Sequence, residues 1–183
     1  MNKTLAITLL AIAVIVIGIF VFAKSTDEDT QEPTHTAFDA KNSVFNIHNT
    51  TVRLVDGVTQ SAAAPGSASK ITTRYFGNEA TGDLNGDGLS DIAFLVTQDT
   101  GGSGLFYYAV VAFQTTNGYQ TTNAFLIGDR IAPQSTEIHS DSKELHINFA
   151  ERKAGEPMST PPSVGAVLLL KVTPSGVLEG LMQ

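Results

Sequence analysis

The sequence predicts an all-β fold, one compact antiparallel sandwich or barrel-like domain behind an N-terminal transmembrane helix. From residue 42 onward, short apolar runs with alternation are separated by clusters of Gly, Asn, Asp, Ser and Pro, as in antiparallel sheets. Beyond residue 24, no stretch keeps a helical apolar period for three turns. A chain of 183 residues also has room for one domain with a real core.

The N-terminal segment, residues 5–23 (LAITLLAIAVIVIGIFVFA), contains no charged side chain. Roughly nineteen apolar positions at 1.5 Å per residue match the hydrocarbon thickness of a bilayer. Ala23 offers a small residue for a signal peptidase, but the run is longer than the apolar core of about 7–15 residues of a signal peptide. Residues 1–24 are therefore interpreted as a membrane anchor, with a cleaved signal segment as the alternative.

The residues after this segment predict a linker and an exported domain. Residues 25–41 (STDEDTQEPTHTAFDAK) are acidic and nearly free of aliphatic side chains, so they are interpreted as a flexible linker. Residues 42–183 would form the β domain. Lys3 and the amino terminus before the segment, against Lys24 and a run of acids after it, favour an extracytoplasmic domain. We expect a single-pass protein of the cell membrane, or a secreted protein if the segment is cleaved.

Charge and cysteine content exclude several classes of partner and site. Nine basic and eighteen acidic side chains follow Lys24, a balance that argues against nucleic acid or anionic lipid as a partner. The chain has no cysteine, which excludes disulfides, a thiol nucleophile and the lipid-modified cysteine of a bacterial lipoprotein.

Nine segments within the domain have the composition and alternation of β-strands, and two dipeptides that tolerate positive φ, Asp56-Gly57 and Asn117-Gly118, indicate turns. The densest apolar segment begins at Leu105 and is predicted to be a central strand buried on both faces. The predicted strands are Val44–His48, Thr51–Val55, Lys70–Phe76, Asp91–Gln98, Leu105–Gln114, Thr122–Ile127, Thr136–Ser140, Glu144–Phe149 and Gly165–Val172.

The stretch GDLNGDGLSD, residues 82–91, has the spacing of a D-x-N-x-D-G calcium loop. Acidic or amide side chains stand at alternate positions of the loop, because alternate side chains of a tightly wound loop converge on one point. Oxygen ligands with three carboxylates suit a hard divalent cation, and a flexible loop suits calcium better than magnesium. The aligned positions 1, 3, 5, 6, 7 and 9 are Asp83, Asn85, Asp87, Gly88, Leu89 and Asp91.

The loop departs from the EF-hand pattern at position 12, which is Phe94 and not glutamate, and no helix is predicted beside it. A D-x-N-x-D-G-x-x-D loop that leads directly into a strand resembles the calcium loops of FG-GAP and VCBS repeats. The motif occurs once and no internal repeat is visible, so a propeller is not expected. The resemblance implies calcium ligands at Asp83, Asn85, Asp87, the carbonyl of Leu89 and Asp91. The alternative is a metal-free loop whose Asp and Asn side chains cap backbone amides in Asx turns.

Segments such as APGSASK, TGGSGLFYYAVVAF and RKAGEPMSTPPSV also make the exported part similar to a group of small, uncharacterised, membrane-anchored bacterial proteins. This resemblance implies no activity, and is consistent with an exported β domain.

The segments EIHS (residues 137–140) and ELHIN (residues 144–148) form a second candidate metal site. If Asp141-Ser142 is a two-residue turn, His139 faces Glu144 and Glu137 faces His146 on one exposed face. This set has the ligand types of a zinc site, and two ordinary cross-strand His and Glu pairs explain it as well.

Other residues are candidates for binding or catalysis. Tyr107 or Tyr108 would suit an aromatic sugar-binding platform, although core packing explains them too. Residues 100–104 (TGGSG) lack the lysine and helix of a P-loop, and Leu105 stands where a G-x-S-x-G elbow needs glycine, which favours a flexible hairpin. No serine stands in a recognisable motif with His and Asp, and no carboxylate pair for glycoside hydrolysis is assignable.

The sequence therefore predicts a membrane-anchored, extracytoplasmic, calcium-binding β module. Its role would be structural or interactive at the cell envelope, with a protein or a glycan as partner. The alternative, from a different class, is an envelope enzyme or enzyme inhibitor with a site near the Gly101–Gly104 hairpin.

Overall fold

Twelve β-strands and one short 3-10 helix make up the part of the chain that the computed structural model describes, residues 37–181. These residues contain no α-helix, and so none that is long and apolar enough to cross a membrane. The predicted anchor, residues 1–24, and the linker up to residue 36 lie outside the described residues. The elements are η1 (Ala40–Asn42), β1 (Val44–Ile47), β2 (Thr50–Arg53), β3 (Val58–Ala62), β4 (Lys70–Gly82), β5 (Asp91–Asp99), β6 (Leu105–Thr115), β7 (Gly118–Thr121), β8 (Phe125–Asp129), β9 (Ala132–His139), β10 (Glu144–Glu151), β11 (Val164–Val172) and β12 (Leu178–Gly180).

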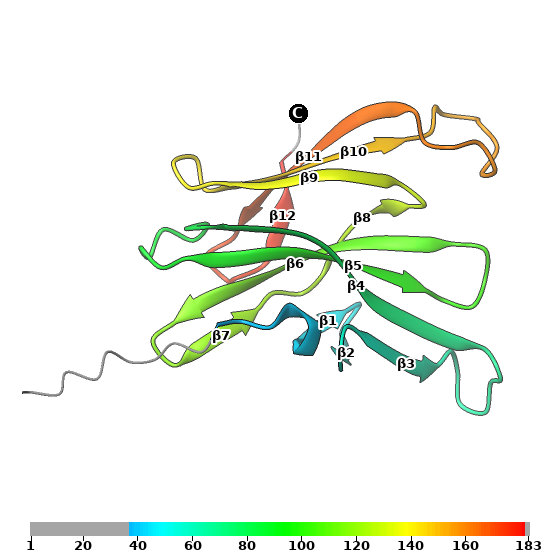
Figure 1. Ribbon diagram of the computed structural model, residues 1–183, viewed down its shortest axis with the longest axis horizontal. Coiled ribbons are helices and arrows are strands. Elements are labelled where there is room, and N and C mark those ends of the chain that lie inside the picture. Colours follow the sequence, from blue (N-terminus) through cyan, green and yellow to red (C-terminus); the bar gives the residue numbers. More distant parts are fainter. Residues whose placement is uncertain (1–36, 182–183) are drawn as a thin grey trace, which may run out of the picture. The chain divides into compact units, whose positions relative to one another are not determined.

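The strands form three antiparallel sheets (Figure 1). A six-stranded sheet has the order β3-β4-β5-β6-β7, and β8 also pairs with β6. A four-stranded sheet, β12-β11-β10-β9, lies along one side of it, and the β1-β2 hairpin lies on the other. The predicted all-β antiparallel fold is confirmed. The sheets do not close into a barrel, so the barrel-like alternative is wrong.

Two apolar cores hold these layers together, and strands β5 and β6 contribute to both. Leu95 and Tyr107 belong to the core shared with the four-stranded sheet, which also contains Leu145, Ile147 and Leu170. Because successive side chains of a strand point to opposite faces, the residues next to Leu95 and Tyr107 along β5 and β6 pack into the other core. The prediction that the aromatic strand is buried on both faces is confirmed.

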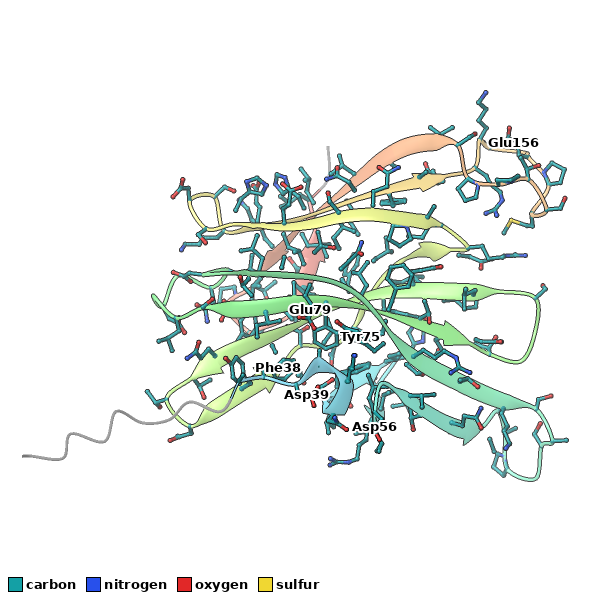
Figure 2. The ribbon with its side chains drawn as sticks, in the orientation of Figure 1. Phe38, Asp39, Asp56, Tyr75, Glu79 and Glu156 are labelled. Carbon is teal, nitrogen blue, oxygen red and sulfur yellow. The ribbon has the colours of Figure 1, made fainter. Side chains whose placement is uncertain are left out.

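The second core lies between the six-stranded sheet and the β1-β2 hairpin. Phe94 is fully buried there, and Phe38 and Tyr75, both labelled in Figure 2, have ring centroids 5.8 and 6.3 Å from that of Phe94. The Tyr75 hydroxyl donates a hydrogen bond of 2.7 Å to Glu79, and burial together with this contact raises the pKa of Tyr75 to about 12. Phe38 therefore ties the start of the described chain to the centre of the fold.

The predicted segments correspond to strands, with differences at the edges of the sheets. The edge strand β3 and the short strands β7 and β12 were not predicted, because they are short and β3 carries mostly polar side chains. The predicted strand 122–127 is wrong in its bounds, because pairing to β6 passes from β7 to β8 around residue 123. Asp56 and Gly57 have φ angles of 50° and 82°, as the predicted tight turn requires.

Candidate metal centre

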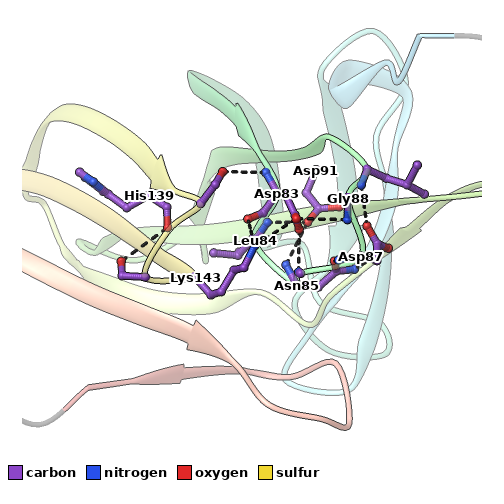
Figure 3. Close-up of polar contacts among 12 residues, drawn as sticks. Asp83, Leu84, Asn85, Asp87, Gly88, Asp91, His139 and Lys143 are labelled. Carbon is purple, nitrogen blue, oxygen red and sulfur yellow. Dashed lines mark hydrogen bonds and ion pairs between the residues drawn. The ribbon is translucent and has the colours of Figure 1, made fainter.

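Residues 83–90 form the loop between β4 and β5, and the paired residues Gly82 and Asp91 close it (Figure 3). Gly86 and Gly88 adopt φ angles of 89° and 83°, which side chains other than glycine rarely reach. These two glycines allow the chain to turn tightly enough to bring the polar side chains of the loop together.

The loop is organised by side chains that accept hydrogen bonds from its own backbone. The two carboxylate oxygens of Asp83 accept from the amides of Gly86 at 2.6 Å and Gly88 at 3.1 Å. Asn85 accepts from the Asp87 amide at 2.9 Å, and Asp87 accepts from the Leu89 amide at 2.8 Å. The bonds of Asn85 and Asp87 reach the amide two residues on and are Asx turns, and all four bonds satisfy backbone donors that the sheet leaves unpaired.

Asp91 is the buried member of the set, with none of its surface exposed. One carboxylate oxygen accepts from the amides of Leu84 at 2.9 Å and Asn85 at 3.3 Å, and the other accepts from the Gln114 amide at 3.1 Å. Burial raises the pKa of Asp91, and these hydrogen bonds oppose that rise. Asp91 thus fastens both the loop and the end of β6 to the start of β5.

A cation from another sheet faces the loop. The ammonium of Lys143 lies 3.0 Å from a carboxylate oxygen of Asp83 and 3.4 Å from its backbone carbonyl (Figure 3). The Asp83 amide in turn donates to the hydroxyl of Ser140 at 3.0 Å. The β9-β10 turn is therefore docked on the loop. It spans the four residues 140–143 and not the predicted two, and Lys143 adopts a φ of 57°.

The pH dependence of stability offers a test of the Lys143 contact. The hydrogen bond from Lys143 is the largest factor that lowers the pKa of Asp83. An acid whose pKa is lower in the folded state stabilises above its unfolded pKa, about 3.9, and this contribution is lost as pH falls through the folded pKa. We expect Lys143→Met to lower the free energy of unfolding at pH 7, with the difference from wild type shrinking as pH falls below about 4. Urea unfolding followed by circular dichroism measures it. A difference that is constant with pH would contradict the role of this ion pair.

The predicted ligands thus lie in one loop, but the oxygens of their Asp and Asn side chains accept hydrogen bonds from backbone amides. The side-chain amide nitrogen of Asn85 donates to Asp87 at 3.0 Å, and Asp83 accepts from the backbone amide of Gly86, which lies between Asn85 and Asp87. Leu89 is half-buried and joins them through its backbone. Within residues 37–181, no three His, Asp or Glu side chains surround one point at metal-binding distances. The donor set itself is all oxygen, which fits the chemistry of calcium.

Three residues that complete this site were not predicted, namely Lys143, Ser140 and Gln114. Their contacts to the loop span 60, 57 and 23 positions of sequence. No local pattern signals such partners, because only the packing of the β9-β10 turn and β6 brings them to the loop.

The His and Glu side chains of β9 and β10 form a second polar cluster. The predicted register is confirmed, with His139 opposite Glu144 and His146 opposite Glu137. The closest polar contacts run along each strand, with His146 Nε2 2.9 Å from Glu144 and His139 Nε2 3.6 Å from Glu137. The contact with His146 is the largest factor that lowers the pKa of Glu144.

The remaining candidate residues lie in the apolar core or in a turn between strands. Tyr107 and Tyr108 are buried, so the sugar-platform interpretation is wrong and the core interpretation is confirmed. Gly101 and its neighbours form an exposed turn between β5 and β6, whose far end is fixed by Asp129, which accepts from the Leu105 amide at 2.9 Å.

Known proteins give no match to the chain. This holds for protein families, for curated proteins and for solved structures alike.

Proposed function

We propose that this protein is a membrane-anchored, extracytoplasmic β module that binds calcium in the loop 83–91 and has a structural or interaction role at the cell envelope. The observation that carries the proposal is the concentration of three carboxylates and one amide oxygen at the junction of β4 and β5, facing the ammonium of Lys143. The proposed ligands are Asp83, Asn85, Asp87, the carbonyl of Leu89 and Asp91.

Electrostatics support a cation at this place. Like charges held in one short loop repel one another, and the charge of Asp87 contributes to the raised pKa of Asp91. Lys143 offsets this repulsion at Asp83 only, with an ammonium whose side chain is 40% exposed. A divalent ion would offset the charge of all three carboxylates at once. To reach Asp83 it has to displace the Lys143 ammonium, and Asp83 and Asp87 have to exchange backbone hydrogen bonds for metal contacts.

The position of the loop gives calcium a structural effect. The loop touches the four-stranded sheet through Ser140 and Lys143 and the six-stranded sheet through Asp91. An ion bound only in the folded state stabilises by mass action, by about 2.7 kcal/mol at a concentration one hundred times its Kd. Calcium would therefore stabilise the loop where it joins the two sheets through Asp91 and the Ser140 contact, outside the cell, where calcium is abundant.

An interaction role is supported by a groove beside the loop. Its lining mixes apolar and charged side chains from four separate segments, so a partner bound there would contact the loop directly. The residues that line it include Leu84, Asn85, Asp87, Phe113, Lys143 and Val172.

Calcium titration of the full-length chain in nonionic detergent tests the proposal. We expect saturable binding with a Kd of about 0.1–1 mM, the range of extracellular calcium modules, and a rise in the melting temperature. Asp87→Ala should abolish both, and this exposed residue bonds only within the loop, so the variant should fold. Asp99→Ala, an exposed acid at the end of β5, is the matched control and should bind as wild type does. Absence of heat and of a melting shift at about 10 mM calcium would overturn the proposal.

A further inference from the structure

The outer face of the four-stranded sheet carries a pair of stacked histidines. His139 on β9 and His146 on β10 have ring centroids 4.0 Å apart at an interplanar angle of 35°. Leu145 and Ile147, which alternate with His146 along β10, point into the core, so the imidazoles face away from it. Their side chains are 45% and 27% exposed, which leaves them open to a solute.

Each imidazole directs the same nitrogen toward a carboxylate. Nε2 of His146 lies 2.9 Å from Glu144, and Nε2 of His139 lies 3.6 Å from Glu137. A carboxylate accepts a hydrogen bond, so the neutral ring of His146 carries its proton on Nε2 and keeps a lone pair on Nδ1. In the described part of the chain, neither Nδ1 takes part in a hydrogen bond. Metal-binding histidines commonly show this arrangement, with one nitrogen on the ion and the other on a carboxylate.

A cation holds Glu144 in place beside His146. The ammonium of Lys171 lies 3.3 Å from the other carboxylate oxygen of Glu144. Transition metals bind imidazole in its neutral form.

We propose that His139 and His146 together bind one divalent transition metal ion of the zinc, nickel or copper class, with Glu144 and Glu137 as supporting carboxylates. With metal–nitrogen distances of about 2.0–2.1 Å and tetrahedral angles, the two nitrogens on one ion are about 3.3 Å apart, so the rings have to turn out of their stack for both to reach the ion. Because no third side chain is already aimed at the same point within residues 37–181, water completes the coordination. Imidazole ligands separate this site from the oxygen-only calcium loop.

Zinc titration of the full-length chain, in nonionic detergent with 5 mM calcium present, tests this site by calorimetry. We expect one zinc ion to bind with a micromolar Kd at pH 7.5, and His139→Ala and His146→Ala each to weaken binding at least tenfold. Glu144→Gln should weaken it by about tenfold, the lower end of the effect of losing a supporting carboxylate.

Matched variants separate this site from others. His48→Ala removes a histidine whose ring meets that of Tyr108 edge-on in another part of the fold, and this variant should bind zinc as wild type does. Asp87→Ala, which disables the proposed calcium loop, should also leave zinc binding unchanged, so the two proposals can fail independently. Zinc binding that is as tight in His139→Ala or His146→Ala as in wild type, or folded wild type that takes up no zinc at 1 mM, would overturn the inference.

Discussion

Asp91→Ala is expected to lower the free energy of unfolding by about 3 kcal/mol, because each buried donor left without an acceptor costs about 1–3 kcal/mol. The carboxylate accepts from three backbone amides, those of Leu84, Asn85 and Gln114. Leu84 itself is 1% exposed, so water cannot easily replace the lost acceptor. Urea unfolding in EGTA measures the change without any contribution from calcium.

Asp91→Asn separates the hydrogen bonds from the charge. Asparagine keeps one acceptor and nearly the same volume, but its amide nitrogen faces backbone donors at one of the two positions. Burial raises the pKa of Asp91, which means that its charge costs stability at neutral pH and that this cost disappears as pH falls through the raised pKa. We therefore expect Asp91→Asn to be destabilised less than Asp91→Ala.

The exposed Asp141 in the β9-β10 turn provides the matched control for both variants. Asp141→Ala should change stability by at most about 0.5 kcal/mol, as surface substitutions usually do. If Asp91→Ala were as stable as Asp141→Ala, Asp91 would not be the fastening point between the loop and the sheet.

How much of the fold can be predicted from the sequence depends on whether a feature is determined by neighbouring residues or by the packing of distant ones. Alternation and turn chemistry are local, so the strand from Leu105 and the turn at Asp56-Gly57 could be predicted. Strand β3 (Val58–Ala62) could not, because an exposed edge strand does not need an apolar face. The order of strands in the sheets depends on which apolar faces meet, and that is a property of the whole chain.

The candidate site likewise has features that follow from the local sequence and features that follow from tertiary packing. The spacing of Asp83, Asn85 and Asp87 indicates an oxygen-rich loop, and the structure places these side chains together. What the spacing cannot show is that Asp91 is buried beneath the loop or that Lys143 faces it, since both depend on the docking of β6 and β9-β10. The local sequence therefore predicts which side chains could bind a metal ion. Tertiary packing decides the charged groups that surround these side chains and their hydrogen-bond partners.

That docking depends on one glycine, and Gly82→Ala is expected to lower the free energy of unfolding by about 1–3 kcal/mol, the usual cost of overpacking. A Cβ at Gly82 would lie 2.8 Å from Cγ2 of Ile138 and 3.0 Å from the hydroxyl of Ser140. The β9-β10 hairpin would have to move away from the loop, which also weakens the Lys143 contact with Asp83.

A strand glycine without neighbours is the matched control for this effect. Around Gly165 in β11, no atom lies within 4 Å of the added Cβ, so Gly165→Ala should be neutral or stabilise by up to about 1 kcal/mol. Ile138→Ala should partly rescue Gly82→Ala, because it removes the Cγ2 that clashes, and a double-mutant cycle from urea unfolding quantifies the coupling. Equal stabilities of Gly82→Ala and Gly165→Ala would mean that the loop and the hairpin are not held in close contact. In that case Lys143 would not be the cation that calcium has to displace, and the link between the two sheets would have to rest on the apolar core alone.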